Sequence, residues 1–312
     1  MSKKITFLFP GQGSHFVGMA RDLYHGFPYI QKLYALANEI AELDITRLSF
    51  EGPEDELNKT SINQLAIVMH SVAVLEVLRR EVGLEKLTIV ATAGLSLGEY
   101  VALYFDESIT FENLIRQIKH RGIYMQEACE KFLGGMASIF GLDEGKVEAI
   151  CEQCTSLGEI RIANYLSPKR LVISGSIGAL NKAIELAKQQ KAKVRQLNVA
   201  GAYHSELMGL ASAKMVAILQ EVEFKKPRIP FITNITAKPV SEPEEIRYNL
   251  IRQIISPVYW FQTINEMISL GANEFWELGP GKVLTGLMKE IDSTKTAISF
   301  ATVEDIERLA EN

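Results

Sequence analysis

Apolar and polar positions alternate along the chain in a way that predicts an α/β protein. Short runs of apolar and β-branched residues at Ile5–Phe9 and Leu87–Ala93 are typical of buried strands. Between these two runs, the apolar positions of Gln64–Arg80 recur at helical spacing. After the second run, residues 111–131 predict another helix. Helices that follow strands in this way favour an α/β framework.

From about Gly134 onward, six shorter elements follow one another. They alternate in the order β-α-β-β-α-β: Met136–Phe140, Lys146–Gln153, Ile160–Ala163, Arg170–Ser174, Gly178–Gln190 and Lys193–Asn198. This order is typical of a ferredoxin-like unit. We therefore predict a small ferredoxin-like subdomain, residues 133–199, inserted into a large α/β-hydrolase-like subdomain made of residues 1–132 and 200–312.

The chain after this insert returns to longer helices and isolated strands. The pattern predicts a helix, a strand, a helix, a short strand and a terminal helix: Ser205–Val222, Pro230–Thr233, Ile246–Ile255, Glu274–Glu277 and a helix from Val283. No internal repeat, low-complexity tract or long linker is visible in the sequence.

Composition narrows the class of protein without indicating a reaction. The 312 residues are 47% hydrophobic and 23% charged, as in ordinary globular proteins. A net charge of −5 and the lack of a basic cluster argue against a nucleic-acid partner. The apolar start at Ile5–Phe9 is cut short by Pro10 and Gly11, and no segment approaches transmembrane length, so we expect a cytoplasmic protein without a membrane partner.

The cysteines do not indicate a metal or redox centre. Cys129, Cys151 and Cys154 are odd in number, which suits reduced thiols in a cytosol. Cys151 and Cys154 form a Cys-x-x-Cys pair, but the pair lies in a helical segment and no second ligand pair exists. The sequence therefore predicts no bound metal.

The strand-like run at residues 87–93 leads directly into Gly94-Leu-Ser-Leu-Gly98, and a helical pattern follows. A strand-to-helix turn with a small residue two positions either side of a serine is a nucleophile elbow. Such a turn presents Ser96 Oγ at the end of a sheet and aims the N–H of Leu97 at the group that the serine attacks. The alternative is that Ser96 only caps the helix.

A serine nucleophile needs a base, and the chain offers five histidines. His204 is favoured because Gly201-Ala-Tyr-His-Ser205 predicts a loop between a strand and a helix, where functional residues gather. His15, which follows a glycine turn, is the next candidate. The remaining histidines have no catalytic context in the sequence: His25, His70 and His120.

A second glycine turn, Gly11-Gln-Gly13, directly follows the first predicted strand. The turn is either a flexible connection or a tight loop with a catalytic task. In the second case, the N–H of Gln12 joins the N–H of Leu97 in an oxyanion hole, where one donor contributes on the order of 10²–10³ in rate.

Five motifs taken together resemble one enzyme family. They are Phe9-Pro-Gly-Gln-Gly-Ser14, Gly94-Leu-Ser-Leu-Gly-Glu-Tyr100, Arg121-Gly-Ile-Tyr-Met-Gln-Glu-Ala128, Ala202-Tyr-His-Ser205 and Glu277-Leu-Gly-Pro-Gly-Lys-Val-Leu284. In their order, and over nearly the whole chain, they resemble the malonyl-CoA:acyl-carrier-protein transacylases of fatty acid and polyketide synthesis. The chain is most similar to the free-standing, trans-acting acyltransferases of polyketide synthases.

The resemblance implies a catalytic apparatus that needs no cofactor. Ser96 would become acylated, His204 would be its general base, and the main-chain carbonyl of Gln253 would orient the histidine without an aspartate. The N–H groups of Gln12 and Leu97 would form the oxyanion hole. The donor would be malonyl-CoA, and the acceptor would be the phosphopantetheine thiol of an acyl carrier protein.

The resemblance also implies which residues bind the acyl group. Arg121 would hold the free carboxylate of a malonyl group as a two-pronged ion pair, which suits a guanidinium. Tyr203, just before the histidine, resembles the malonyl-selective form of the family, in which a bulky ring leaves no room for an α-methyl branch. Asn164 matches the asparagine that the family has in this segment.

Two departures from the family pattern alter this expectation. Leu95 stands where the family usually has a histidine before the nucleophile, which changes the wall of the acyl pocket but leaves the serine and its base. Leu166 and Arg170 stand where asparagine and glutamine are commoner. Both departures are compatible with a specialised member of a polyketide pathway and with substrates other than malonyl.

Two alternatives remain open at this point. An acyl hydrolase of the same fold would clear stalled acyl groups from carrier proteins; Leu95 is compatible with it, but Arg121 argues against it because an uncharged acyl chain gains nothing from a buried arginine. A non-enzymatic module that docks carrier proteins is the other, and the presence of Ser96, His204 and both glycine turns argues against it.

Overall fold

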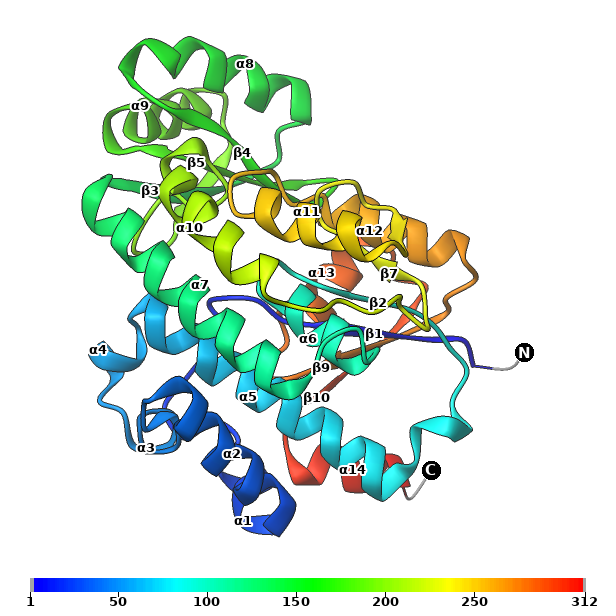
Figure 1. Ribbon diagram of the computed structural model, residues 1–312. Coiled ribbons are helices and arrows are strands. Elements are labelled where there is room, and N and C mark those ends of the chain that lie inside the picture. The colour runs from blue at the N-terminus through cyan, green and yellow to red at the C-terminus, as the bar shows by residue number, and fades with distance from the viewer. Residues whose placement is uncertain (1–2, 311–312) are drawn as a thin grey trace.

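Two β-sheets form the framework of the protein. The computed structural model describes residues 3–310, and most of its helices and strands are labelled in Figure 1. The strands are β1 (Ile5–Phe9), β2 (Ile89–Gly94), β3 (Gly134–Phe140), β4 (Ile160–Ser167), β5 (Arg170–Ser176), β6 (Lys193–Gln196), β7 (Phe231–Ile232), β8 (Pro239–Val240), β9 (Glu274–Leu278) and β10 (Thr296–Phe300). The larger sheet has the order β10-β9-β1-β2-β7-β8, and the smaller has the order β4-β5-β3-β6.

Parallel pairing in the larger sheet brings two loops to the same edge. β1 pairs in parallel with both β2 and β9, β9 pairs in parallel with β10, and β2 with β7. All of β1 is buried, as expected of a central strand covered on both faces. Phe9 lies opposite Gly94 where β1 and β2 end. The glycine turn after β1 and the serine turn after β2 therefore leave the sheet side by side.

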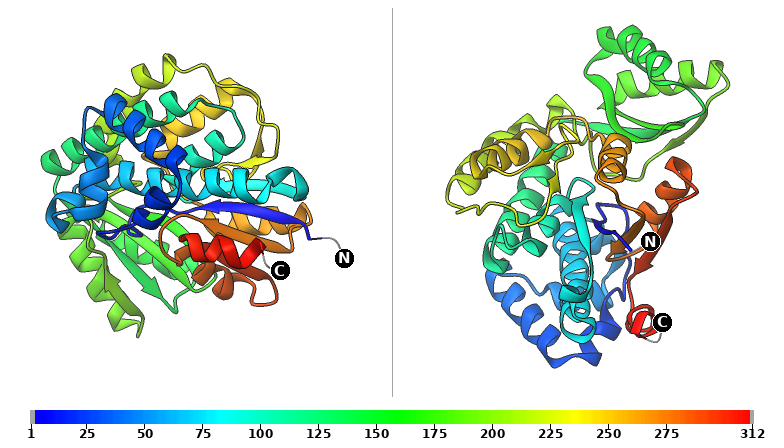
Figure 2. Two further views of the ribbon diagram at one scale, coloured as in Figure 1. Left: turned by 90° about the horizontal axis from the view of Figure 1, so that it is seen from below. Right: turned by 90° about the vertical axis from the view of Figure 1, so that its right-hand side faces the viewer.

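Helices pack around this sheet and make up most of the large subdomain (Figures 1 and 2). The helices are α1 (Arg21–Gly26), α2 (Pro28–Ala41), α3 (Ile45–Glu51), α4 (Glu54–Leu57), α5 (Thr60–Val77), α6 (Gly98–Phe105), α7 (Phe111–Lys131), α8 (Glu144–Cys154), α9 (Ile177–Gln189), α10 (Gly209–Gln220), α11 (Pro243–Gln253), α12 (Trp260–Ser269), α13 (Val283–Ile291) and α14 (Val303–Ala310). Short helical turns are η1 (Leu78–Val82), η2 (Leu84–Lys86), η3 (Thr155–Leu157) and η4 (Glu206–Met208).

Helix α5 corrects the expectation that no segment approaches transmembrane length. With the turn η1 it forms a helical segment, Thr60–Val82, whose 23 residues are long and apolar enough to cross a membrane. However, 94% of its apolar window is buried inside the protein. Its hydrophobicity is therefore accounted for by packing, since a helix that is apolar all round suits the core of a large domain as well as a membrane.

The smaller sheet confirms the ferredoxin-like insert. Its neighbouring strands all run antiparallel, and their order is that of a ferredoxin-like unit, with α8 and α9 packed against the sheet. The insert has a hydrophobic core of its own, which includes Ile139, Ile150, Ile173 and Leu180. The right-hand view of Figure 2 shows this lobe projecting from the large body. The boundaries at residues 133 and 199 stay a prediction.

The C-terminal third departs most from the sequence prediction. The helix predicted from Val283 begins there but ends at Ile291, and β10 and α14 follow it without having been predicted. β10 is a half-exposed edge strand with a mixed polar pattern, which gives a weak signal. Helix α12 was also missed, because its first residues, Trp260 and Phe261, are aromatic and favour strands.

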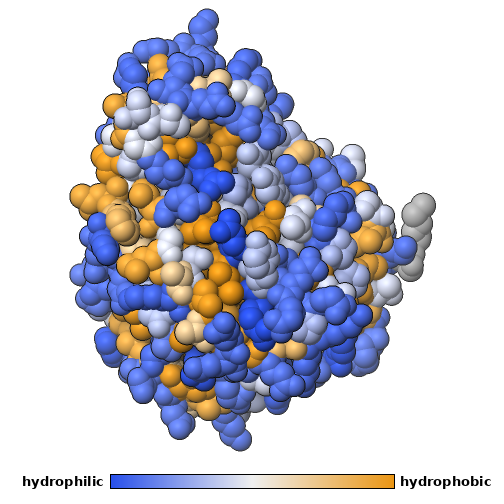
Figure 3. All heavy atoms as spheres, turned by 45° about the horizontal axis from the view of Figure 1, so that its top comes forward, coloured by the Kyte–Doolittle hydropathy of each residue, from blue (hydrophilic) through white to orange (hydrophobic). Residues whose placement is uncertain are grey.

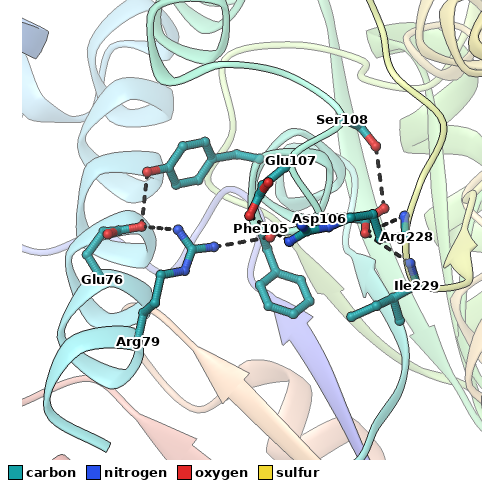
Figure 4. A network of polar contacts seen from close by, with 9 residues as sticks. Glu76, Arg79, Phe105, Asp106, Glu107, Ser108, Arg228 and Ile229 are labelled. Atoms are coloured by element: carbon teal, nitrogen blue, oxygen red, sulfur yellow. Dashed lines mark hydrogen bonds and ion pairs between the residues drawn. The ribbon is translucent and has the colours of Figure 1, made fainter. Parts of the chain in front are cut away.

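A polar network fastens the C-terminal end of α6 (Figure 4). Glu76 of α5 accepts hydrogen bonds from Nη1 of Arg79 at 2.6 Å and from the hydroxyl of Tyr104 at 3.0 Å, and Nη2 of Arg79 donates to the carbonyl oxygen of Phe105 at 3.1 Å. Asp106, just after the helix, accepts from two backbone N–H groups at 2.8 and 3.0 Å; these belong to Arg228 and Ile229.

Candidate active site

The turn between β2 and α6 is a tight strand-to-helix elbow. Ser96 lies at its centre with a left-handed backbone, φ +50°, a conformation that non-glycine residues adopt rarely and that the surroundings must hold. A Cβ on Gly94 would lie 1.9 Å from the carbonyl carbon of Gly98, and one on Gly98 would lie 2.1 Å from the carbonyl oxygen of Phe9. Both glycines are required for strand, turn and helix to meet.

Two amide side chains hold the peptide units on either side of Ser96. The Ser96 N–H donates to Oδ1 of Asn234 at 2.6 Å, and Nδ2 of Asn234 donates to the carbonyl oxygen of Gly94 at 2.7 Å. The Ser96 carbonyl oxygen accepts from Nε2 of Gln253 at 2.9 Å. Asn234 and Gln253 follow Ser96 by 138 and 157 residues, so the elbow is held by the tertiary structure.

Arg121 reaches Ser96 from helix α7 and is fully buried. Its Nη2 donates to Ser96 Oγ at 3.0 Å and to Oε1 of Gln253 at 3.1 Å, while Nη1 donates to Oε1 of Gln64 at 2.8 Å. Its Nε has no hydrogen-bond partner among the described residues. Burial lowers the pKa of the guanidinium from its usual value. Every hydrogen-bond acceptor of this buried cation is thus neutral, and one donor is unused.

His204 lies in the loop before η4, also with a left-handed backbone, and only 4% of it is exposed. Its Nδ1 lies 2.8 Å from the carbonyl oxygen of Gln253. A carbonyl can only accept, so Nδ1 carries the proton and Nε2 keeps its lone pair. Burial lowers the pKa of His204 to about 4, and the nearby charge of Arg121 adds to this effect. The imidazole is therefore neutral near pH 7.

Within residues 3–310 the Ser96 hydroxyl makes no direct hydrogen bond to His204; its hydrogen bond comes from Arg121. Such catalytic contacts are often long in an enzyme without substrate and tighten when substrate binds. Gln253 connects the two groups, because its side chain bonds the Ser96 carbonyl and its main-chain carbonyl bonds the histidine.

The glycine turn after β1 packs directly against the elbow. The N–H of Leu95 donates to the carbonyl oxygen of Phe9 at 2.9 Å, and a Cβ on Gly11 would lie 2.5 Å from the Leu95 carbonyl oxygen. In the part of the chain that the structure describes, neither the Gln12 N–H nor the Leu97 N–H donates to a protein acceptor. Both are free to bind an oxyanion.

A cavity of about 240 Å³ adjoins the site. It is lined by Gln12, Gly13, His15, Asn58, Asn63, Asn198, Val199, Ala200 and Tyr203. Gln12 belongs to the glycine turn and Tyr203 precedes His204, so the cavity begins next to both loops. Figure 3 shows polar and apolar surface mixed between the insert lobe and the large body. Amide side chains and a histidine give this cavity a mainly neutral, hydrogen-bonding wall.

The three remaining predicted site residues, Tyr203, Leu95 and Asn164, lie in three different surroundings. Tyr203 is buried, and its hydroxyl lies 2.7 Å from Oγ1 of Thr60. Leu95 is partly buried and adjoins Ser96 in the turn. Asn164 lies in β4, where it forms an isolated bridge to Val258. No described side-chain hydrogen bond joins Asn164 to the serine, the histidine or the arginine.

Among the described residues, neither the other histidines nor the cysteines hydrogen-bond Ser96, Arg121 or His204. His15 hydrogen-bonds Oδ1 of Asn58 at 2.8 Å, and His70 hydrogen-bonds the carbonyl oxygen of Ala301 at 2.7 Å. Cys129, Cys151 and Cys154 are buried free thiols. Among residues 3–310 there is no group of three or more histidine, cysteine, aspartate or glutamate side chains that could hold a metal ion.

Three polar residues of the site were not found by sequence reasoning. Glu99 and Asn234 brace the elbow, and Gln64 holds Arg121. Glu99 reads as an ordinary acidic residue in the first turn of a helix, and Gln64 as the polar start of an apolar one. Asn234, which follows the predicted strand at Pro230–Thr233, gives the one available signal, because polar residues at strand ends often serve a site.

Comparison with known proteins identifies the class. Residues 6–306 match the family model of the acyl transferase domain, so the chain belongs to this acyltransferase family.

Its relatives narrow this class further. The chain is 39% identical over 306 residues to the malonyl CoA-acyl carrier protein transacylase of Bacillus subtilis, covering 97% of this chain and 95% of that relative. It is 36% identical over 295 residues to the Escherichia coli protein of that name, covering 94% of each.

Solved structures agree over the whole length. The malonyl CoA-acyl carrier protein transacylase of Coxiella burnetii has a TM-score of 0.95 at 32% identity, covering 100% of this chain and 98% of that one. A malonyl-transacylase in complex with a type II PKS acyl-carrier protein has a TM-score of 0.94 at 35% identity, covering 99% and 100%. The predicted two-subdomain α/β fold is confirmed.

Proposed function

We propose that the protein transfers a malonyl group from malonyl-CoA to the phosphopantetheine thiol of an acyl carrier protein, through an ester on Ser96. The observation that carries this proposal is Arg121, a fully buried guanidinium 3.0 Å from Ser96 Oγ with neutral acceptors only. A buried cation is costly unless it is paired. A substrate that brings its own carboxylate supplies the charged hydrogen-bond acceptor that Arg121 lacks, and the names of the relatives agree with this substrate.

In the first half-reaction, the malonyl carboxylate pairs with Arg121 and takes over donors that now reach Ser96. The hydroxyl then turns to Nε2 of His204, which accepts its proton as Oγ attacks the thioester carbonyl. The N–H groups of Gln12 and Leu97 hold the resulting oxyanion. His204 returns the proton to the departing sulfur, and coenzyme A leaves as the free thiol.

In the second half-reaction, the thiol of the carrier protein enters in place of coenzyme A. His204 takes its proton, the thiolate attacks the ester carbonyl, and Ser96 leaves with the proton that the histidine returns. Atoms balance with no redox change, so the exchange requires no cofactor. The kinetics are ping-pong because the donor leaves before the acceptor reacts. The reaction serves fatty acid or polyketide synthesis.

The hydrolase alternative differs only in the acceptor, with water taking the place of the thiol. Arg121 argues against it, since the apolar end of a neutral acyl chain would desolvate the guanidinium without pairing it. The docking-module alternative is disfavoured by the free N–H groups of Gln12 and Leu97, which serve no structural hydrogen bond. The complex of a structural relative with an acyl-carrier protein supports the carrier protein as the partner.

Intact mass spectrometry after brief exposure to malonyl-CoA or acetyl-CoA tests the proposal. We expect a malonyl adduct on the wild type, little acetyl adduct, and none on Ser96→Ala, because no other side chain can replace Oγ at the elbow. Addition of an acyl carrier protein should then remove the adduct and leave malonyl on the carrier. A malonyl adduct that persists on Ser96→Ala would place the nucleophile elsewhere.

A further inference from the structure

The carboxylate of Glu99 lies beneath the serine elbow and has no part in the chemistry described above. Glu99 is in the first turn of α6 and is fully buried. One of its oxygens accepts a hydrogen bond from the backbone N–H of Asn234, and the other accepts from Nε2 of Gln253. An ionisable group is rarely buried so completely unless its contacts matter to the fold or the site.

Both partners of Glu99 are the residues that hold Ser96. Asn234 receives the Ser96 N–H on its side-chain oxygen, and Gln253 donates to the Ser96 carbonyl oxygen. Glu99 is thus the common anchor of the peptide units before and after the serine. The left-handed backbone of Ser96 is a strained conformation, which persists only where neighbouring contacts enforce it.

Glu99 also fixes which way the Gln253 side-chain amide points. The NH₂ group of Gln253 faces two acceptors, the Glu99 carboxylate and the Ser96 carbonyl oxygen, so its Oε1 must face Arg121. If the amide turned over, its NH₂ would meet the donor Nη2 of Arg121, and its oxygen would meet two acceptors. The carboxylate therefore keeps an acceptor in front of the arginine.

We propose that Glu99 is a positioning residue for the acyl transfer: its carboxylate orients the Gln253 amide and braces Asn234, and through these two groups it sets the positions of Ser96 and Arg121. The functional consequence of this inference rests on the proposed function, and its geometry rests on the five hydrogen bonds given above. It makes the neutral amide network of the active site dependent on one buried negative charge.

The surroundings of Glu99 define how its charge responds to pH. Arg121 on α7 is the charged group whose field favours the carboxylate. Strands β1 and β2, which pack on α6, carry no titratable side chain, and on α5 Glu76 contacts Tyr104 at the other end of α6. Burial raises the pKa of Glu99 to about 7, whereas the pKa of His204 is lowered to about 4 and that of Tyr100 is raised to about 12.

The test compares Glu99→Gln with Asp106→Asn, an equally conservative change at the other end of the same helix. The readout is the rate at which a neutral fluorophosphonate ester labels Ser96, measured from about pH 5.5 to 9. This probe needs no malonyl group, so its result is separate from that of the proposed function, which malonyl loading of the wild type tests on the same samples.

We expect Glu99→Gln to slow labelling by about 10- to 100-fold, because small misplacements of reacting groups have effects of this size. In the wild type, labelling should fall as the pH drops through about 7, and this acid limb should be absent in Glu99→Gln. Glu99→Asp, which keeps the charge, should retain the limb and recover part of the rate. Asp106→Asn should label like the wild type.

Two results would overturn the inference. One is a folded Glu99→Gln variant that labels at the wild-type rate with the same acid limb. The other serves if Glu99→Gln does not fold: a Glu99→Asp variant that labels at the full wild-type rate, although its shorter side chain draws the carboxylate back from Gln253 and Asn234, would show that this carboxylate does not position Ser96.

Discussion

Helix α6 has a polar network at each end, and each network contains an arginine. One arginine is paired with a carboxylate, whereas the other has only neutral hydrogen-bond acceptors. At the C-terminal end, Arg79 forms an ion pair with Glu76 and also caps the carbonyl of Phe105 (Figure 4). At the N-terminal end, Arg121 meets a hydroxyl and two amide oxygens, and its Nε has no partner among the described residues. The side chain of Arg79 is 32% exposed, whereas Arg121 is fully buried.

The more costly arrangement is therefore the one at the serine. A buried charge loses several kcal/mol of solvation, which neutral hydrogen-bond acceptors and the nearby Glu99 carboxylate, to which Arg121 makes no hydrogen bond, offset only in part. If Arg79 lost its partner, water could solvate the partly exposed guanidinium, whereas the buried guanidinium of Arg121 is out of reach of solvent. We therefore infer that the C-terminal network serves stability, whereas the N-terminal network is completed by the carboxylate of the proposed substrate.

The largest effect on the rate is expected when the proposed general base, His204, is replaced. The matched control is His70, a second buried histidine. Burial lowers the pKa of both His204 and His70 to about 4. His204→Ala should slow malonyl loading and transfer to the carrier by about 10²–10⁴-fold, because the same imidazole moves the proton in both half-reactions. His70→Ala should leave both rates nearly unchanged in the folded fraction. Quenched-flow measurement of acyl-enzyme formation checks this.

Near-normal loading by His204→Ala would require another base, and His15, on the wall of the adjoining cavity, is the next residue to replace. Loss of loading in a folded His70→Ala variant would contradict the comparison, because it would show that a buried histidine affects loading without a contact to Gln253.

The second largest effect is expected on substrate selectivity, and it tests the difference between Arg121 and Arg79. Arg121→Ala should lower malonyl loading by at least about 10²-fold, since two charge-assisted hydrogen bonds of about 1.5–3 kcal/mol each are lost. Acetyl and longer neutral acyl groups should load as well or better, because no desolvated guanidinium opposes them. Arg79→Ala should leave the ratio of malonyl to acetyl loading unchanged. Competition between the two thioesters, followed by intact mass, gives the ratio.

The hydrolase alternative is tested on the same variants with a carrier protein bearing a neutral acyl chain. Rapid release of free acid by the wild type, together with negligible malonyl loading, would contradict the transferase. Equal selectivity in Arg121→Ala and wild type would show that the buried guanidinium does not recognise the substrate.

The contrast between the two networks also explains what the sequence could reveal. Ser96 and its flanking glycines form a local pattern, because strand, turn and helix are consecutive, and the motifs around Arg121 and His204 extend this by resemblance. Glu99 and Asn234 could not be found in this way. Their role arises from contacts across more than a hundred residues, and a glutamate in a first helical turn or an asparagine after a strand is common.

The same limit applies to the fold. The insert was predictable because its six elements are short, consecutive and alternate cleanly, so that local periodicity gives the order of the sheet. β10 lies at the edge of the large sheet, where only its last two residues are buried and the period-2 signal is weak. Helix α5 misled the estimate of membrane-spanning length because it is buried on nearly every face, so its apolar residues are not confined to the single face that helical spacing indicated.

A third, smaller effect concerns stability at the C-terminal network. Glu76→Ala should lower the free energy of unfolding by about 1–3 kcal/mol, because it leaves Nη1 of Arg79 and the Tyr104 hydroxyl without their acceptor. The matched control is Glu244→Ala, which removes an ion pair of a glutamate whose side chain is 81% exposed and should cost about 0–1 kcal/mol. Urea unfolding measures both. A Glu76→Ala variant with unchanged stability but an altered preference for malonyl would contradict the inference that the network at the C-terminal end of α6 serves stability and not substrate recognition.

The last comparison concerns how the two buried carboxylates link stability to pH. Burial raises the pKa of Asp106 from 3.8 to about 6 and that of Glu99 from 4.5 to about 7. Between the two values of each pair, the folded protein binds more protons than the unfolded chain, so this contribution to stability falls as the pH rises. Asp106→Asn, which keeps the Oδ1 acceptor, should remove the decline between about pH 4 and 6, and Glu99→Gln the decline between about pH 4.5 and 7. Urea unfolding at a series of pH values gives each difference from the wild type. If the stability of Asp106→Asn depended on pH as that of the wild type does, the Asp106 carboxylate would be solvated in the folded protein. Only the carboxylate at the N-terminal end of α6 would then link stability to pH.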